Sequence, residues 1–222
     1  MGVGHFAVAV TLKKMDRRIN LGFLVFAAMF ADFLLGLLVL TGIEQVHIPA
    51  NFASLHYLTF TFPFSHGLAA SLFWALAAFL LARTLFKWDT LAGLTLSIAV
   101  FSHFILDWIV HIPELPLLGP GSPLLGLGLW NNIWMGLGVE MVLVLIALAV
   151  YLGAIPSLSL TNRLGVAIIL VLFSALTVVG QALSTQAPPP MAAAATWIGE
   201  TLLVSGIAFW LDRSSALKKT DH

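Results

Sequence analysis

Six apolar runs of membrane-spanning length constrain this chain more than any other feature. A helix that crosses the hydrocarbon core of a bilayer needs about 20 consecutive apolar residues. The runs of this length cover residues 21–43, 64–86, 91–112, 131–154, 164–183 and 192–211. Residues 3–12 are also apolar but reach only about half that length, which predicts a half-helix or a re-entrant segment. The sequence therefore predicts an all-α, polytopic membrane bundle of six transmembrane helices plus a short N-terminal helix.

Composition agrees with a membrane protein. Hydrophobic residues make up 60% of the 222 residues, charged residues only 9%, and the mean hydropathy is +1.02, which excludes a water-soluble domain. The zero net charge gives no indication of nucleic-acid binding. The absence of cysteine excludes disulfides and thiolate metal ligands. The first apolar stretch precedes its basic residues, the reverse of a signal peptide, so no cleavable signal is expected.

The breaks between the runs indicate one domain. Proline and glycine concentrate in residues 113–123, and further prolines stand at position 156 and at 188–190. No internal repeat or long linker interrupts the chain. We therefore expect a single transmembrane domain over residues 1–222, with a core in residues 1–155 and two additional helices in residues 156–222.

The basic residues predict an orientation, because Lys and Arg are retained on the cytoplasmic side of a membrane. With six spans, all ten fall on one side: Lys13, Lys14, Arg17, Arg18, Arg83, Lys87, Arg163, Arg213, Lys218 and Lys219. The loops 44–63, 113–130 and 184–191 contain none and are predicted to face outward. This pattern predicts a multi-pass protein of the bacterial inner membrane with a cytoplasmic C-terminus.

Ionisable side chains inside the apolar runs are candidates for a functional site. His103, Asp107 and His111 recur at i, i+4 and i+8 and therefore share one helical face. Each such group costs several kcal/mol in hydrocarbon unless it is paired, hydrated or bound to a metal. Other apolar runs contain three more of these groups, at comparable predicted depth: Asp32, His66 and Glu140. Together they predict a buried polar site.

Metal coordination is the chemistry that this mixture of histidine and aspartate favours. Neutral imidazole and carboxylate oxygen suit Zn²⁺, Mn²⁺ or Fe²⁺, and we expect Zn²⁺. The predicted ligands are His66, His103, Asp107 and Asp32, with His5 as a further ligand. Glu140 is predicted to act as a general base or acid. Three residues are candidates for contacts that orient the ligands, namely His111, Ser65 and Ser102.

Purely structural interpretations stand beside these predictions. A single intramembrane histidine such as His66 or His103 can serve only to hydrogen-bond one helix to another. Asp32 and Asp107 could each pair with a buried histidine without binding metal. Glu44, Glu114 and Glu200 are expected at interfaces or on helix surfaces, without a chemical role.

A family resemblance appears at the same residues. Gly4-His5 near the N-terminus, Asp32 in the first run, Ser65-His66 and Ser102-His103-x-x-x-Asp107 together resemble the bacterial membrane-bound metal-dependent hydrolases of the YdjM type. The resemblance covers about residues 1–155, and its most specific part is the Ser-His-x-x-x-Asp element. It implies an inner-membrane protein with a metal site and hydrolase activity.

Three functions are compatible with this pattern. The first is a metal-dependent hydrolase that takes a lipid-like or amphiphilic substrate from the outer leaflet, with residues 113–130 as a lid. The second is a transporter for protons or metal ions, in which buried carboxylates and histidines are also expected. The third is a structural subunit of a membrane complex. The density of the polar group argues against the third, and the missing charged path to the cytoplasmic side argues against the second.

Overall fold

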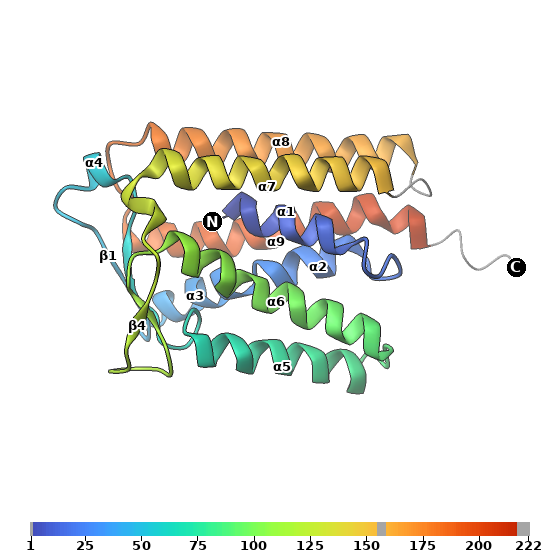
Figure 1. Cartoon of the computed structure of the whole chain (residues 1–222), viewed down its shortest axis with the longest axis horizontal. Coiled ribbons are helices and arrows are strands. Elements are labelled where there is room, and N and C mark those ends of the chain that lie inside the picture. The colour runs from blue at the N-terminus through green and yellow to red at the C-terminus, as the bar shows by residue number, and fades with distance from the viewer. Residues whose placement is uncertain (1, 155–158, 217–222) are drawn as a thin grey trace, which may run out of the picture.

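The computed structural model describes residues 2–154 and 159–216, and this part of the chain is predominantly helical. Five long helices run roughly alongside one another (Figure 1); they are α5 (Leu68–Thr84), α6 (Thr90–Val110), α7 (Ile133–Ala154), α8 (Leu160–Ala182) and α9 (Pro190–Ala216). The shorter helices are α1 (Gly2–Leu12), α2 (Leu21–Ala28), α3 (Phe30–Leu40), α4 (Phe52–Leu55) and the 3-10 turn η1 (Leu129–Asn131).

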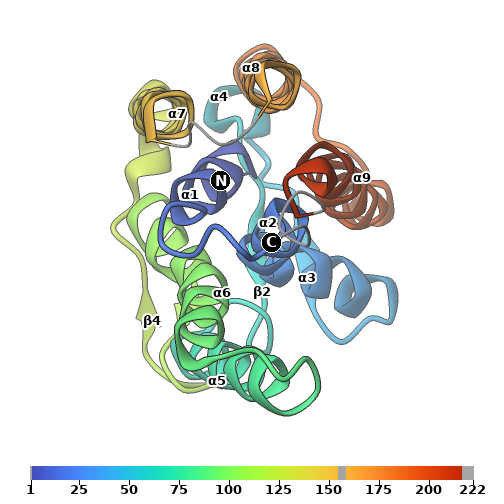
Figure 2. The ribbon, with the colours of Figure 1, turned by 90° about the vertical axis from the view of Figure 1, so that its right-hand side faces the viewer.

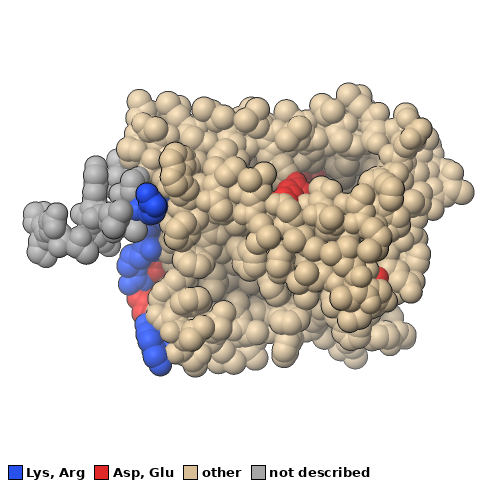
Figure 3. All heavy atoms as spheres, turned by 180° about the vertical axis from the view of Figure 1, so that it is seen from behind, with Lys and Arg blue, Asp and Glu red and all other residues tan. Residues whose placement is uncertain are grey.

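Two small antiparallel sheets lie together at one end of the bundle, which we call the loop end (Figure 1). Strand β1 (Gln45–His47) pairs with β2 (Thr59–Thr61), and the register places Val46 opposite Phe60. Strand β3 (Leu115–Pro116) pairs with β4 (Leu124–Leu125). The described Lys and Arg residues gather at the opposite end, which we call the basic end (Figure 3).

The number of spanning helices differs from the prediction. Four helices, α6 to α9, are long and apolar enough to cross a membrane, and α2 with α3 makes a fifth if this pair, bent by 53°, counts as one span. The prediction of six spans is therefore not supported. The run 64–86 is helical only from Leu68, over 17 residues, because the Glu44 carboxylate accepts the backbone N–H groups of Phe64 and Ser65 in a turn.

Helix α1 lies in the middle of the bundle, beside α2, with the other helices around them (Figure 2). Its side chains Val3, Phe6, Ala9 and Val10 are fully buried. The 11 residues of α1 extend about 16 Å at 1.5 Å per residue, which is half the thickness of a bilayer core. The predicted short N-terminal helix is thus present.

Helix α9 packs closely on α2 and α3. A Cβ atom built on Gly36 would lie 2.6 Å from an Ile198 side-chain carbon and 2.7 Å from the Ala194 carbonyl oxygen, so only glycine allows this approach. Near the basic end, α9 also meets α8, where a Cβ on Gly165 would lie 2.7 Å from Leu211. The contact at Gly36 fixes α9 to α3, the helix that carries Asp32.

Candidate metal centre

The centre is built around Asp107, one helical turn after His103 on α6. The Asp107 Oδ2 atom lies 3.1 Å from Nε2 of His103 and 3.4 Å from Nε2 of His66. His111, one turn further along, places its Nε2 3.8 Å from the same oxygen. One carboxylate oxygen therefore faces three imidazole nitrogens from α6 and from the turn before α5.

Asp32, in the first turn of α3, approaches the same nitrogens from another side. Its Oδ1 atom lies 3.6 Å from Nε2 of His66 and 3.7 Å from Nε2 of His103. The two Nε2 atoms are themselves 3.1 Å apart. Asp32, His66 and His103 thus offer three ligand atoms that lie within 4.8 Å of one another.

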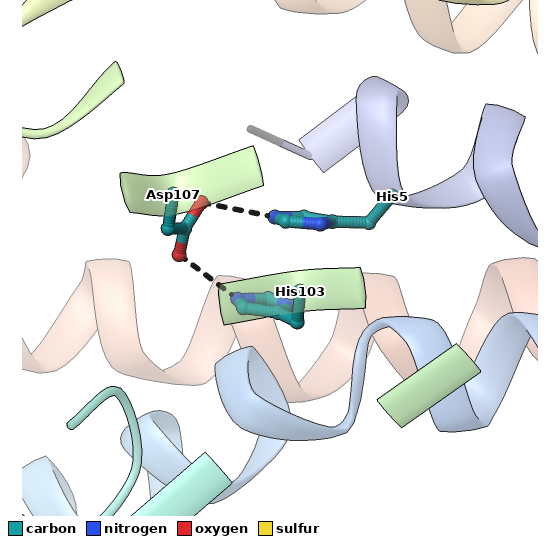
Figure 4. A group of neighbouring side chains, drawn as sticks. All are labelled: His5, His103 and Asp107. Atoms are coloured by element: carbon teal, nitrogen blue, oxygen red, sulfur yellow. Dashed lines mark ion pairs between the residues drawn. The ribbon is translucent and has the colours of Figure 1, made fainter. Parts of the chain in front are cut away.

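His5 joins the group from α1. Its Nε2 lies 3.2 Å from Oδ1 of Asp107, and its ring stacks on that of His103 with 3.6 Å between centroids and 8° between planes (Figure 4). Neither His5 nitrogen forms a hydrogen bond of good geometry with any described residue, although the side chain is fully buried. His5, His103 and Asp107 form a second set of potential ligands, which shares His103 with the set of Asp32, His66 and His103.

The partner of His103 Nδ1, the ring nitrogen that points away from Asp107, shows where the proton of the neutral ring lies. This nitrogen lies 2.8 Å from the carbonyl oxygen of Ala28. A carbonyl can only accept, so Nδ1 must donate and a neutral ring then presents a lone pair at Nε2. Ala28 is the last residue of α2, and the break between α2 and α3 leaves carbonyl groups available to partners outside the helix.

His66 and His111 are oriented in the same way by acidic residues. The Ser65 hydroxyl donates to Glu44 Oε2 (2.6 Å) and accepts from Nδ1 of His66 (2.7 Å). Nδ1 of His111 donates to Glu114 Oε1 (2.6 Å). All three histidines therefore direct a proton-free Nε2 toward the Asp107 carboxylate when neutral. Such outward hydrogen bonds are the usual way in which proteins fix the orientation of metal-bound histidines.

This arrangement brings lone pairs of imidazole nitrogens and carboxylate oxygens close together. Two Nε2 atoms at 3.1 Å and carboxylate oxygens at 3.1–3.7 Å repel one another unless a cation or protons lie among them. Imidazole nitrogen and carboxylate oxygen are also the donor set of zinc and related divalent metals. The buried group can hold a metal ion, and its residues fit that ligand chemically.

The structure brings together all five residues predicted as ligands, namely His5, Asp32, His66, His103 and Asp107. Of the residues predicted to orient them, Ser65 contacts His66 and His111 faces Asp107. Ser102 lies elsewhere: its hydroxyl donates to the Ala99 carbonyl of its own helix.

Glu140 also lies apart from the convergent nitrogens. It is fully buried on α7, and its Oε2 accepts the backbone N–H of Gly4 (3.2 Å) in the first turn of α1. Its other carboxylate oxygen has no hydrogen-bond partner among the described residues. A carboxylate at this position also interacts favourably with the N-terminus of α1.

Sequence reasoning missed two residues of the site. Glu44 and Glu114 were expected at interfaces, yet both are buried and hold the outward nitrogens of the histidines, Glu44 through Ser65. The spacing His111-Ile112-Pro113-Glu114 was the available signal, because proline stops the helix and lets the chain turn back on itself. No local pattern connects Glu44 with Ser65, which lies 21 residues later.

A cavity of about 350 Å³ connects this centre with the surroundings of the bundle. Asp32, His66, Asp107 and His111 form its inner wall, and aromatic residues from the loop end cover it, among them Phe60, Phe62 and Trp130. Viewed from behind, acidic atoms are visible at the bottom of a hollow in an otherwise uncharged flank (Figure 3). The centre is therefore buried but accessible.

Comparison with known proteins gives no relative for this chain: no family model, no curated protein and no solved structure matches it.

Proposed function

We propose that the chain is an integral-membrane metal-dependent hydrolase. The observation that carries the proposal is the convergence of imidazole Nε2 atoms on Asp107 Oδ2, with each Nδ1 already engaged by an outward acceptor. His66, His103, Asp107 and Asp32 would hold the ion, with His5 as a further ligand. The resemblance of residues 1–155 to YdjM-type hydrolases supports the same function.

Zinc is the metal that we propose, with Mn²⁺ and Fe²⁺ as alternatives, because the donor set contains nitrogen and oxygen but no sulfur. A divalent ion in such a site supplies Lewis acidity, which polarises a carbonyl group and acidifies a nearby water. The chain itself contributes orientation: Ala28, Ser65 and Glu114 hold the three imidazole rings in place. The aromatic cover limits the access of bulk water.

Glu140 is the residue that we propose for proton transfer. It is a buried carboxylate whose Oε1 has no hydrogen-bond partner among the described residues, so it can take up and return a proton. Glu140→Gln should abolish turnover and leave the metal content unchanged. If Glu140→Gln loses both metal and activity, Glu140 is instead a metal ligand. If its activity is unchanged, the role of Glu140 is limited to its contact with Gly4.

Packing between the two ends of the bundle favours hydrolysis over transport. Between the metal centre and the basic end, apolar side chains of α1, α2, α6 and α7 form one buried cluster that includes Phe6, Val10, Leu24 and Ala147. An ion pathway would need polar groups along this stretch. The cavity instead opens toward the loop end and the flank, as a site that receives and releases a substrate from one side requires.

We place the protein in the bacterial inner membrane, with the loop end outside and the basic end in the cytoplasm, on the positive-inside rule. The cavity would then receive a lipid-like substrate from the outer leaflet. A cysteine introduced at Ser122 in the cysteine-free chain should react with an impermeant thiol reagent added outside, whereas one at Lys14 should not. If Lys14→Cys reacts from outside and the cysteine at Ser122 does not, the orientation is the reverse of the one proposed.

Hydrolysis is tested by a screen of esters, amides and phosphodiesters that carry acyl chains. Wild-type protein loaded with Zn²⁺ should hydrolyse at least one class, and His103→Ala should be inactive at the same protein concentration. The same two proteins are assayed for ion flux in liposomes. If the wild type and His103→Ala differ in ion flux but hydrolyse every compound in the screen equally, the protein is a transporter and not a hydrolase.

A further inference from the structure

The cavity reaches from the metal centre to the facing surfaces of α8 and α9, the two C-terminal helices. On α8 the residues that line it recur at i, i+3 and i+4 and form one face, namely Thr177, Gly180 and Gln181, and Ser184 follows just after the end of the helix. On α9 the lining residues are Thr196, Trp197 and Glu200. Both helices thus direct a polar face into the cavity, while Leu176 and Leu183 of α8 are more than two-thirds exposed on the outside.

The two helices meet at the basic end and separate toward the loop end. Gly165 of α8 touches Leu211 of α9 near the basic end. Toward the loop end, α9 is held by α3 at Gly36, whereas the middle of α8 packs on α1, with ring centroids of Phe6 and Phe173 6.3 Å apart. The separation leaves the hollow in the flank that Figure 3 shows. In a membrane, this flank faces the acyl chains of the lipids.

The charges on the cavity wall restrict what it can bind. Asp32, Asp107 and Glu200 line it, and no Lys or Arg is among its described lining residues. A divalent metal at the centre would balance Asp32 and Asp107, and Glu200 would then be the remaining acidic side chain among the described residues of the cavity wall. No described side chain forms an ion pair with Glu200. The wall would therefore attract an ammonium group and repel a phosphate or carboxylate.

A second polar group lines the same cavity from the facing helix. The Gln181 side-chain oxygen is buried, and no hydrogen bond from a described residue reaches it. An unpaired buried acceptor is costly, so a ligand that donates a hydrogen bond would relieve that cost. An amino group carries such donors.

We propose that the gap between α8 and α9 is the side entrance for an amphiphile that bears an amino group, and that Glu200 and Gln181 bind this group while the acyl chain lies between the helices. The inference rests on the proposed function in so far as the bound molecule is a substrate. Glu200 is then a residue that determines specificity, and phosphate-bearing lipids without a free amine are excluded.

Photolabelling tests the entrance without relying on enzyme activity. Protein in nanodiscs of zwitterionic lipid is irradiated with a diazirine-bearing fatty amine or with the matching fatty acid, and the adducts are located by peptide mass spectrometry. The amine should label the cavity-facing residues of α8 and α9, and the acid should label them at least about tenfold less, as expected when a charge-assisted contact is lost.

Three variants make the test specific. Glu200→Gln should lower amine labelling about tenfold, and Gly180→Leu should block it, because a side chain there has open space and projects into the entrance. Gly199→Leu is the control, since Gly199 has equal room for a Cβ but does not line the cavity. Equal labelling by amine and acid, or labelling unchanged in both Glu200→Gln and Gly180→Leu, overturns the proposal.

Metal content measured on the same samples separates this inference from the proposed function. Without metal the cavity wall is more negative, so amine labelling should persist in metal-free protein. Selective labelling of a protein that binds no metal would support the entrance and refute the hydrolase. A metal-loaded protein that labels without selectivity would leave the hydrolase intact and refute the entrance.

Discussion

Two buried polar clusters lie at different levels of this bundle: one around Lys13 and Asp212, the other around Asp107. They differ in how hydrogen-bond donors and acceptors are matched. Toward the basic end, the Lys13 ammonium donates to Asp212 Oδ2 (2.6 Å) and to the carbonyl oxygens of Arg17 (2.9 Å) and Ile19 (2.5 Å). All three of its protons thus have an acceptor. In the metal centre, imidazole and carboxylate acceptors face one another at 3.1–3.8 Å.

On our proposal, this difference separates a structural cluster from one that binds a metal. Lys13 and Asp212 balance each other in charge, and Asp212 Oδ2 also accepts the N–H of Leu21 (2.7 Å), so no external partner is required. The centre around Asp107 instead gathers imidazole nitrogens and carboxylate oxygens, which are the donor set of a divalent metal, and in the ion pairs of the described residues its aspartates face histidines rather than Lys or Arg. Burial alone therefore does not indicate function, whereas the balance of donors and acceptors does.

Removal of one partner of the structural pair should have the largest effect on folding. Lys13→Met leaves the Asp212 carboxylate buried without its cation, which should lower the free energy of unfolding by about 3–5 kcal/mol. Metal content should stay unchanged. Denaturant unfolding in micelles provides the measurement, with Lys14→Met as control, because Lys14 is exposed. A loss below 1 kcal/mol would contradict the contrast between the clusters.

Asp107→Asn should mainly lower the affinity for metal. The substitution keeps the shape of the side chain but removes the charge that four histidines face, so Zn²⁺ affinity should fall by more than about a hundredfold. Calorimetric titration with Zn²⁺ gives the affinity. Retained affinity in Asp107→Asn would exclude Asp107 as a ligand.

The outward contacts of the histidines should matter less than the ligands. Ser65→Ala removes the acceptor of His66 Nδ1, and such losses lower metal affinity about 10- to 100-fold. Ser102→Ala is the matched control, because the Ser102 hydroxyl contacts only a carbonyl of its own helix. Equal affinities of the two variants would show that the Ser65 contact does not orient a ligand.

The smallest effect is expected at the exposed charges of the basic end. Arg18 lies between Asp16 and Asp89, and its hydrogen bond to Asp16 lowers the pKa of that carboxyl below its ordinary value of 3.8. The contact therefore stabilises the fold above about pH 4 and is lost as the pH falls through the lowered pKa. Arg18→Met should lower the stability only slightly at pH 7, and this effect should shrink as the pH falls below about 4, as unfolding curves across this range would show.

The sequence predicted which ionisable residues lie together better than it predicted the helices that carry them. Ionisable residues in apolar runs are rare and costly, so Asp32, His66, His103 and Asp107 stand out without any knowledge of packing. The break at Met29 is invisible to a hydropathy count, because residues on both sides are equally apolar. The turn that shortens α5 depends on Glu44, 20 residues before Phe64. Such contacts arise only in the folded chain.

Elemental analysis of the purified protein tests the central claim most directly. Wild-type protein should retain about one equivalent of a divalent metal, zinc before others, and chelator should remove it with a fall in thermal stability. His103→Ala should contain no metal while Lys14→Met retains it. A wild-type protein that is folded without metal, takes up no Zn²⁺, Mn²⁺ or Fe²⁺ and is unchanged by chelator would contradict the account.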